Sequence, residues 1–428
     1  MIRFLSKASN AGWTFALAIF LGYVALPYWL EATKRGSDYG KLETVAAFAA
    51  LGILFGAYGP KERIAWPKLR IHLGAFLFCT WLSFIVFAIV AFSTAEKIPL
   101  IAAFQGAGAA EVAVLREKFL KAREGWQASL VYINAIFTGA LIPYALSLMF
   151  IHRARFRWVF FCLFLLYSLS FTEKAFFLKG ALPFLYLALQ GKIRIPVSPK
   201  VVIAGIMILL FGVTAVSRVG SEEVEDQGNF FSVAYVPHTP FQHLMWRSII
   251  VPMVTASDAL HVFEKKFKEE PLQGATSSII AAALGKPRIP FERLVFTEQW
   301  GQNETGTGSS NSAFFTEAYV NFLWFGVLAF SFIAGRILRL MAESNDEAYK
   351  SLWMLFCFGL YNSGLIGLLL SNGFAVVLTL ALLARIDPAS RRNQHSSLNI
   401  SSKEHGQERT HTRDGGSRLY WLSPGPPS

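Results

Sequence analysis

The sequence predicts an all-α fold, a polytopic bundle of about ten transmembrane helices with one large loop outside the cytoplasm. The first observation is composition. Of 428 residues, 54% are hydrophobic and only 16% are charged, with 39 Phe, whereas about a quarter of a typical soluble chain is charged. The second is a series of apolar runs close to the ~20 residues that a spanning helix needs. The third is a regular recurrence of basic residues between these runs.

The apolar runs have a continuous pattern, which favours helices over the alternating pattern of outer-membrane strands. The clearest runs are 11–30, 42–59, 71–92, 128–150, 201–217 and 313–334. Two further runs are less regular. The run 158–190 predicts two short spans that meet near Glu173, and the run 351–385 predicts a tight hairpin that bends between Asn362 and Gly373.

Basic residues give the predicted orientation, because short cytoplasmic loops retain Lys and Arg. With Arg3 and Lys7 inside, every second connection carries a basic cluster. These clusters are Lys61, Arg63, Lys68 and Arg70; Arg153, Arg155 and Arg157; Lys192, Arg194 and Lys200; and Arg336, Arg339 and Lys350. Both termini are therefore predicted in the cytoplasm. The net charge of +12 follows mainly from this topology, and nucleic-acid binding is not predicted.

The chain divides into four predicted regions. They are an N-terminal transmembrane bundle of about seven spans (1–217), a large outer loop (218–312), C-terminal transmembrane spans (313–386) and a cytoplasmic tail (387–428). The tail is rich in Ser, Arg, Gly, Asn and Gln, which predicts disorder. The segment 111–124 has apolar residues at helical spacing between charges, which predicts a short amphipathic helix on the outer interface.

The outer loop 218–312 has about ninety residues, far more than a connection between two helices requires. Its aromatic residues and prolines predict an ordered cap, which suits a substrate with a polar head and a lipid tail. Its polar candidates are Arg218, His238, His243, Arg247, Asp258, Arg288, Arg293, Glu298 and Glu304.

Several of these candidates carry two interpretations. A guanidinium binds phosphate oxygens in a bidentate fork, and an imidazole accepts a proton near neutral pH. Arg218 equally fits an interfacial anchor at the end of a span. Arg247 lies four residues after His243, so the pair also fits a solvated helix face. His238 and His243 match no zinc pattern, and no metal site is predicted.

Ionisable residues inside a bilayer cost about 2.5 kcal/mol or more on insertion scales, so they are functional candidates. Glu317 enters with the run 313–334, and Asn321 follows one turn later on the same face. We expect both side chains to project into the bundle or a cavity rather than into lipid.

The segment 307–339, TGSSNSAFFTEAYVNFLWFGVLAFSFIAGRILR, resembles the O-antigen polymerase family of bacterial inner-membrane oligosaccharide repeat-unit polymerases. The likeness lies in a Gly/Ser-rich loop end followed by Phe-x-x-Glu-x-Tyr-x-Asn-Phe, which begins at Phe314. Family members often carry Gly directly after Asn-Phe, where this chain has Leu323. The architecture agrees up to about residue 385: many spans, cytoplasmic termini and a large periplasmic loop before the last spans.

The resemblance implies a glycosyltransferase that joins polyprenyl-diphosphate-linked oligosaccharide units into O-antigen or a related surface or exopolysaccharide. Arg and Lys would stabilise the departing diphosphate, and a carboxylate or His would accept the acceptor's proton. For the phosphate and substrate contacts we expect Arg218, Arg247, Arg288 and Asn321, with Arg116 or Lys118 assisting. For the base or sugar-orienting group we expect Glu317, His238 or His243.

No cofactor is expected. The first outer loop, 31–41, lacks the adjacent acidic pair of metal-dependent polytopic glycosyltransferases, which favours a metal-independent reaction. The implied partners are the lipid-linked oligosaccharide, membrane lipid, and chain-length regulator and flippase proteins. Three alternatives stay open: an O-antigen ligase-like transferase, a flippase or transporter of lipid-linked oligosaccharide, and a structural or assembly protein.

Overall fold

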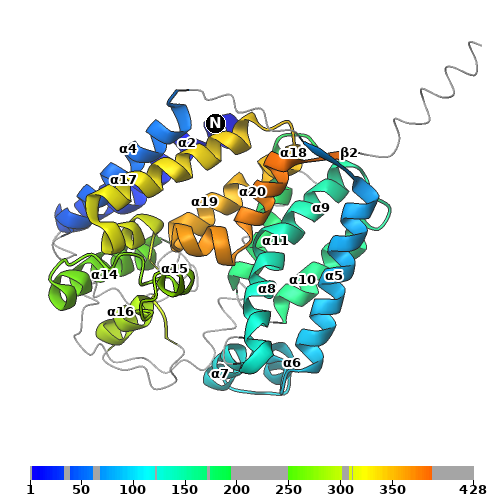
Figure 1. Cartoon of the computed structure of the whole chain (residues 1–428), viewed down its shortest axis with the longest axis horizontal. Coiled ribbons are helices and arrows are strands. Elements are labelled where there is room, and N and C mark those ends of the chain that lie inside the picture. Colours follow the sequence, from blue (N-terminus) through cyan, green and yellow to red (C-terminus); the bar gives the residue numbers. More distant parts are fainter. Residues whose placement is uncertain are drawn as a thin grey trace, which may run out of the picture.

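The computed structural model describes residues 2–32, 39–60, 68–120, 123–170, 174–193, 249–300, 308–310 and 312–387. Over these residues the protein is mostly helical, and its long helices form a bundle (Figure 1). The predicted span 201–217 and the predicted disorder after residue 387 lie outside the described residues.

Five helices in the described part of the chain are long and apolar enough to cross a membrane. They match all the clearest predicted runs except 201–217. The first consists of η1 (Ala8–Asn10), α2 (Ala11–Phe20), η2 (Leu21–Ala25) and α3 (Leu26–Ala32). The second, third and fifth are the single helices α4 (Gly40–Tyr58), α5 (Leu73–Ser93) and α17 (Phe314–Glu343). The fourth consists of η3 (Gly125–Ser129), α8 (Leu130–Ile136), η4 (Phe137–Leu141) and α9 (Ile142–Ile151).

Small residues bring α4 and α17 into close contact. A Cβ atom at Gly56 would lie 2.2 Å from the carbonyl oxygen of Phe332, and one at Gly335 would lie 2.3 Å from that of Ile53. Transmembrane helices pack in this way because small side chains let their backbones approach. The pair α4–α17 therefore forms the centre of one half of the bundle.

The two less regular runs each form two helices. The run 158–190 contains α10 (Arg157–Leu169) and α11 (Lys174–Leu189). The run 351–385 contains α19 (Trp353–Asn362), the π-helical turn η6 (Gly367–Ser371) and α20 (Phe374–Leu383). The chain breaks after Asn362 and turns at Gly373, whose φ of 77° is left-handed, so the bend lies where the sequence predicted it.

A short parallel pair of strands departs from the predicted all-α class. Strand β1 (Leu69–His72) pairs with β2 (Ala384–Asp387), with Leu69 opposite Ala384. Each strand adjoins a helix end, β1 before α5 and β2 after α20. The pairing supplies hydrogen bonds to backbone groups where the helices stop.

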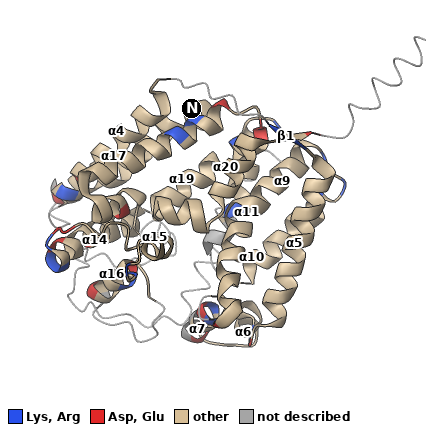
Figure 2. Ribbon diagram, viewed as in Figure 1, with Lys and Arg blue, Asp and Glu red and all other residues tan. Residues whose placement is uncertain are grey.

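The connections sort into two ends of the bundle. The N-terminus, the two strands and α18 (Glu347–Ser351) lie at one end, and α6 (Pro99–Phe104) and α7 (Ala109–Leu120) lie at the other (Figure 1). Most charged residues lie near these two ends (Figure 2). This grouping is the one that the alternating basic clusters predict; which end faces the cytoplasm stays a prediction.

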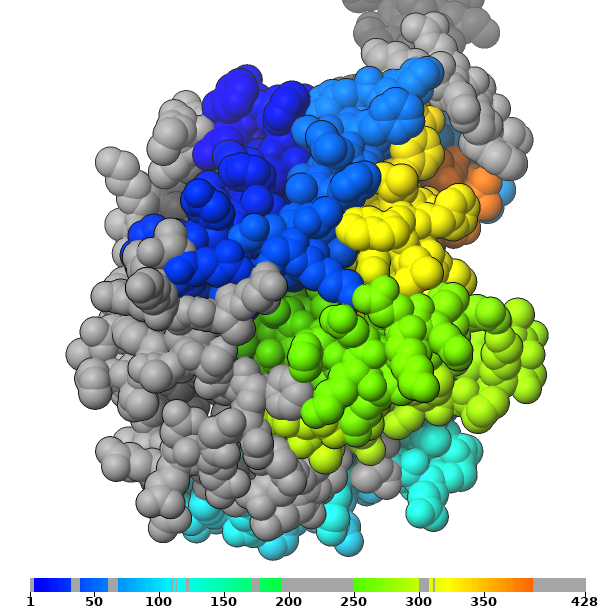
Figure 3. All heavy atoms as spheres, turned by 90° about the vertical axis from the view of Figure 1, so that its left-hand side faces the viewer, coloured from blue at the N-terminus to red at the C-terminus, as the bar shows by residue number. Residues whose placement is uncertain are grey.

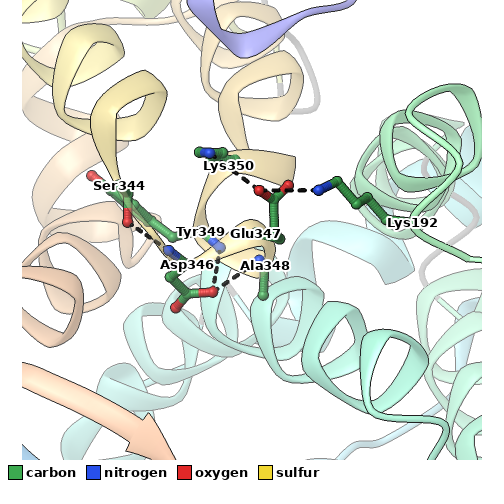
Figure 4. Close-up of polar contacts among 7 residues, drawn as sticks. All are labelled: Lys192, Ser344, Asp346, Glu347, Ala348, Tyr349 and Lys350. Atoms are coloured by element: carbon green, nitrogen blue, oxygen red, sulfur yellow. Dashed lines mark hydrogen bonds and ion pairs between the residues drawn. The ribbon is translucent and has the colours of Figure 1, made fainter. Parts of the chain in front are cut away.

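At the strand end, α18 is held by polar contacts (Figure 4). The Asp346 carboxylate accepts hydrogen bonds from the backbone N–H groups of Ala348 (2.9 Å) and Tyr349 (3.2 Å), which makes it the N-cap. Glu347 forms ion pairs with Lys192 (3.3 Å) and Lys350 (3.1 Å). These bonds join the connections 190–193 and 344–352 at one end.

Three further helices form a unit at the opposite end, which we call the module: α14 (Val251–Phe267), α15 (Ser278–Ala283) and α16 (Phe291–Trp300). Phe267 packs against Phe263 and Phe291, and Phe263 packs edge-on against Tyr319 of α17. Figure 3 shows the module (green) next to the N-terminal helices (blue). The module thus shares the hydrophobic core of the bundle.

Helix α17 is kinked at Leu323, whose φ of 53° and ψ of −146° are non-helical. A kink frees carbonyl groups, which need new partners where water is scarce. Here the backbone N–H of Leu272 donates to the carbonyl of Val320 (3.1 Å), and that of Gln273 donates to the carbonyl of Asn321 (2.9 Å). The module segment 272–276 therefore docks on the kink.

The backbone at Leu323 leads to a stability prediction. A left-handed backbone at a bulky residue costs about 1–3 kcal/mol, and only glycine adopts it freely. Leu323→Ala and Leu323→Gly lose the same side-chain packing beyond Cβ, so we expect the glycine variant to unfold at the higher temperature in detergent.

The matched control is Leu328 in the regular part of α17, where the side chain is exposed. There the order should reverse, because glycine in a helix costs about 1 kcal/mol relative to alanine. A less stable glycine variant at both positions would contradict the kinked geometry.

Candidate active site

A cavity of about 440 Å³ lies where the module meets α7, α8 and the start of α17. Its wall contains residues from α7, from the module and from two candidate spans. The polar lining residues are Glu117, Tyr132, Thr276, Arg288, Glu292, Arg293, Ser309, Ser312 and Glu317. Apolar groups such as Val131 and Phe291 complete the wall. Such a mixture of apolar surface and a few polar groups is typical of a ligand site.

Glu317 lies in the first turn of α17. Its carboxylate is close to Gly364, where a Cβ atom would lie 2.2 Å from Oε2, so only glycine leaves room for it. The backbone N–H groups of Leu365 and Ile366 point to the same carboxylate. Oε2 is buried and has no hydrogen-bond partner among the described residues. The site therefore holds a fixed carboxylate with one oxygen left for a ligand.

Two arginines of the module contribute positive charge. The Arg293 guanidinium pairs with Glu117 at 3.2 Å, which joins α16 to α7 across the cavity. This pair is worth little in stability, because more than half of the Arg293 side chain is exposed. Arg288 also lines the cavity, and its side chain makes no ion pair within the described residues. Its five N–H donors are available to an anionic ligand.

A buried network fixes the segment 308–310 to the module. Gln299 Nε2 donates to the Asp258 carboxylate at 2.7 Å, and the Ser310 hydroxyl donates to Gln299 Oε1. The Ser310 backbone N–H also donates to the carbonyl of Glu292 at 3.0 Å. Burial raises the pKa of Asp258 from its ordinary value of 3.8 to about 7, although the Gln299 hydrogen bond opposes this effect.

Asn321 is fully buried, and its side-chain amide forms hydrogen bonds within the protein. Its Oδ1 accepts from the backbone N–H of Gly274 at 2.9 Å. Its Nδ2 donates to Thr276 Oγ1 and to the carbonyl of Glu317, both at 2.8 Å. The sequence predicted a substrate-binding amide, whereas the described contacts give Asn321 the task of joining the module to the turn that carries Glu317.

The structure brings together two of the predicted site residues, Glu317 and Arg288, which line one cavity. Arg116 and Lys118 flank the lining residue Glu117 on α7 but do not line the cavity themselves. Four predicted residues lie outside the described part of the chain: Arg218, Arg247, His238 and His243.

Other loop candidates have structural places. Glu298 pairs with Lys266 at 2.5 Å and does not line the cavity, and Glu304 lies outside the described residues. Three lining residues, Thr276, Glu117 and Glu292, were not among the residues predicted from the sequence. The signal for Glu292 was its position beside Arg293, a charged pair that begins α16.

A second cavity, of about 300 Å³, lies at the opposite end of the bundle. Arg339 is the basic side chain among its described lining residues; it pairs with Glu343 at 3.1 Å and donates to the carbonyl of Gly59 at 2.5 Å. These bonds hold the end of α4 against α17. The charge is already neutralised, so this cavity is the weaker candidate.

Comparison with known protein families, with curated proteins and with solved structures found no match. Within the described residues, no group of three His, Cys, Asp or Glu side chains is placed to hold a metal ion. The described lining of the first cavity supplies a carboxylate acceptor at Glu317 beside guanidinium and hydroxyl donors.

The raised pKa of Asp258 predicts a pH dependence of stability. An acid with a raised folded-state pKa stabilises the fold while it is protonated, and this contribution is lost as pH rises from about 4 to about 7. The slope is at most about 1.4 kcal/mol per pH unit. Asp258→Asn keeps an acceptor for Gln299 but cannot ionise.

We therefore expect the stability of the wild type relative to Asp258→Asn to fall between pH 4 and pH 7 and to stay constant above that range. Thermal unfolding in detergent at a series of pH values measures this difference. A pH-independent difference would show that Asp258 is not buried as described. Glu298→Gln, at the partly exposed ion pair with Lys266, is the control.

Proposed function

We propose that this chain is a metal-independent glycosyltransferase that polymerises polyprenyl-diphosphate-linked oligosaccharide repeat units. The product would be O-antigen or a related surface or exopolysaccharide, made at the periplasmic face of a bacterial inner membrane. One observation carries the proposal: Glu317 and Arg288 line the same cavity, and among the described residues Glu317 Oε2 has no hydrogen-bond partner and Arg288 has no ion pair.

The proposed reaction uses these two groups on opposite sides of the sugar. The acceptor hydroxyl attacks the anomeric carbon of the donor, and the bond from this carbon to the diphosphate oxygen breaks. The hydroxyl proton passes to the Glu317 carboxylate, which typically contributes about 10²–10⁴-fold to such a step. The departing diphosphate keeps the bond electrons, and Arg288 stabilises its charge.

The position of the cavity supports a lipid-linked substrate. Its wall includes the start of two candidate spans, through Glu317 on α17 and through Val131 and Tyr132 on α8. A site at the beginning of spans lies near the border between water and hydrocarbon. A lipid-anchored sugar would present its diphosphate at this depth. The proposal includes about ten spans, cytoplasmic termini and the module on the periplasmic side.

The backbone at Leu323 supports the resemblance to O-antigen polymerases. Family members often carry glycine at this place, directly after Asn-Phe. In this chain the leucine there has a φ of 53°, a conformation that glycine adopts freely and leucine does not. The position thus has the backbone geometry that the family's usual residue would explain.

A deletion strain tests the reaction class. Analysis of its lipid-linked sugars should show single capped repeat units, because polymerisation fails after the units have reached the periplasmic face. Long polymer left on the carrier would instead indicate a ligase. Units that accumulate on the cytoplasmic face would indicate a flippase. Normal polysaccharide in the deletion strain would contradict all three functions: polymerase, ligase and flippase.

Site variants in the deletion strain test the residues. We expect Glu317→Gln to reduce polymer at least about 100-fold, because an amide cannot accept the proton. The matched control is Glu298→Gln, which changes a carboxylate on α16 of the module, away from the cavity. Equal activity of both variants at equal membrane levels would remove Glu317 from the mechanism.

Arg288→Ala should likewise lower activity, by about 100-fold or more, since one removed donor to a developing charge costs about 2.7–4 kcal/mol. Lys286→Ala is its control: Lys286 lies in the same loop, donates to Gln273 Oε1 at 2.5 Å and does not line the cavity. A comparable loss in both variants would indicate a general effect of loop charge.

A further inference from the structure

The side chain of Thr276 has a hydrogen-bond geometry that its neighbours dictate. Asn321 can face it only with Nδ2, because the other amide atom accepts from the Gly274 backbone N–H, which is a donor only. The same Nδ2 also donates to the carbonyl of Glu317, which is an acceptor only. Two backbone groups thus fix the amide orientation independently.

The consequence concerns the hydroxyl hydrogen of Thr276. Because Asn321 Nδ2 donates to Thr276 Oγ1 at 2.8 Å, the oxygen acts as acceptor in that bond. A threonine hydroxyl has one hydrogen to donate, and none of the described residues accepts it. Thr276 lines the cavity, so this hydrogen is available there to a ligand.

Arg288 is held beside Thr276. The backbone N–H of Ile289 donates to the carbonyl of Ala275 at 2.9 Å, which closes the loop between them and brings residues 276 and 288 together. Both residues line the cavity. The two ends of one loop therefore present a guanidinium and a hydroxyl, both of them donors, which suits the oxygens of a phosphate group.

We propose that Thr276 is a substrate-binding residue that donates its hydroxyl hydrogen to a diphosphate oxygen beside Arg288. In the same proposal Asn321 is the positioning residue that sets the direction of this donation. The inference rests on the proposed function, because it assigns the diphosphate of the lipid-linked substrate to this side of the cavity. It gives the site a phosphate end, formed by Thr276 and Arg288, and a carboxylate end at Glu317.

The test measures binding of farnesyl diphosphate to the purified full chain in nanodiscs, with inorganic pyrophosphate and farnesol as companion probes. Thr276→Val removes the hydroxyl at nearly constant shape and should weaken farnesyl diphosphate binding about ten-fold, the size expected for one hydrogen bond to a charged group. Thr276→Ser keeps the hydroxyl and should bind within about three-fold of the wild type.

Farnesol has no phosphate, and its binding should be the same in the valine variant and the wild type. Pyrophosphate shows whether the diphosphate is recognised without the lipid tail. If Thr276→Val also binds pyrophosphate about ten-fold more weakly than the wild type does, the hydroxyl recognises the diphosphate itself, which supports the proposal. Unchanged farnesyl diphosphate binding in Thr276→Val would overturn it. An equal loss in the serine and valine variants would also overturn it, because the hydroxyl would then not be the cause.

Asn321→Asp tests the positioning role. The aspartate still accepts from Gly274 but now also accepts from Thr276, so the hydroxyl hydrogen turns away from the cavity. Thr276→Val should then cause no further loss of affinity in the Asn321→Asp background. A full ten-fold loss there would remove Asn321 from this role. Unfolding temperatures of each variant check that the module stays docked.

The failure of this inference is separable from failure of the proposed function. Suppose that the deletion strain accumulates single capped repeat units and that Thr276→Val binds the probes normally. The polymerase function would then be supported, and the role of Thr276 in diphosphate binding would be contradicted. A wild-type chain that binds neither diphosphate probe would overturn the assignment of the diphosphate to this cavity. Normal polysaccharide in the deletion strain would remove the polymerase function itself.

Discussion

The docking of segment 272–276 on the kinked helix α17 is the contact on which the candidate site depends. The kink at Leu323 interrupts the helix just after Val320 and Asn321, and the module supplies backbone N–H groups to the carbonyls of both residues. Without these bonds, two acceptors would stay unpaired at the border of the membrane, each at a cost of about 1–3 kcal/mol. The docked segment in turn places Thr276 in the wall of the cavity.

The kink and the docking support each other energetically. The left-handed backbone of Leu323 destabilises the fold by about 1–3 kcal/mol. The two backbone hydrogen bonds to the module stabilise it by about 0.5–1.5 kcal/mol each, which offsets a similar amount. The Asn321 amide adds three bonds, to Gly274, Thr276 and Glu317. The strain at Leu323 thus lies next to the carbonyls of Val320 and Asn321 on which the module docks, between one and two turns after Glu317. A straight α17 would offer the module no free carbonyls.

Composition and periodicity were enough to predict the five long apolar helices of the described residues, because hydrophobicity of this kind is a local property of each segment. Glu317 was predictable on the same basis, because it is a carboxylate at the start of an apolar run. The pairing of Leu69 with Ala384 was not predictable, since two four-residue strands far apart in the chain carry no joint signal. The kink in α17 was not predictable either, because Leu is a good helix former and position 323 carries neither Gly nor Pro, the residues that usually indicate a break in a helix.

The charges of the cavity give the proposed reaction a direction. Its described wall contains the carboxylates of Glu117, Glu292 and Glu317 and the guanidinium groups of Arg288 and Arg293. Arg293 is committed to Glu117, so Arg288 is the cation left for a diphosphate. Under the proposed function, the lipid diphosphate of the donor would lie against Arg288, and the acceptor hydroxyl would approach from the side of Glu317. In the proposed reaction these two groups lie on different elements, so the proposal has the acceptor approach the anomeric carbon from the side opposite the departing diphosphate.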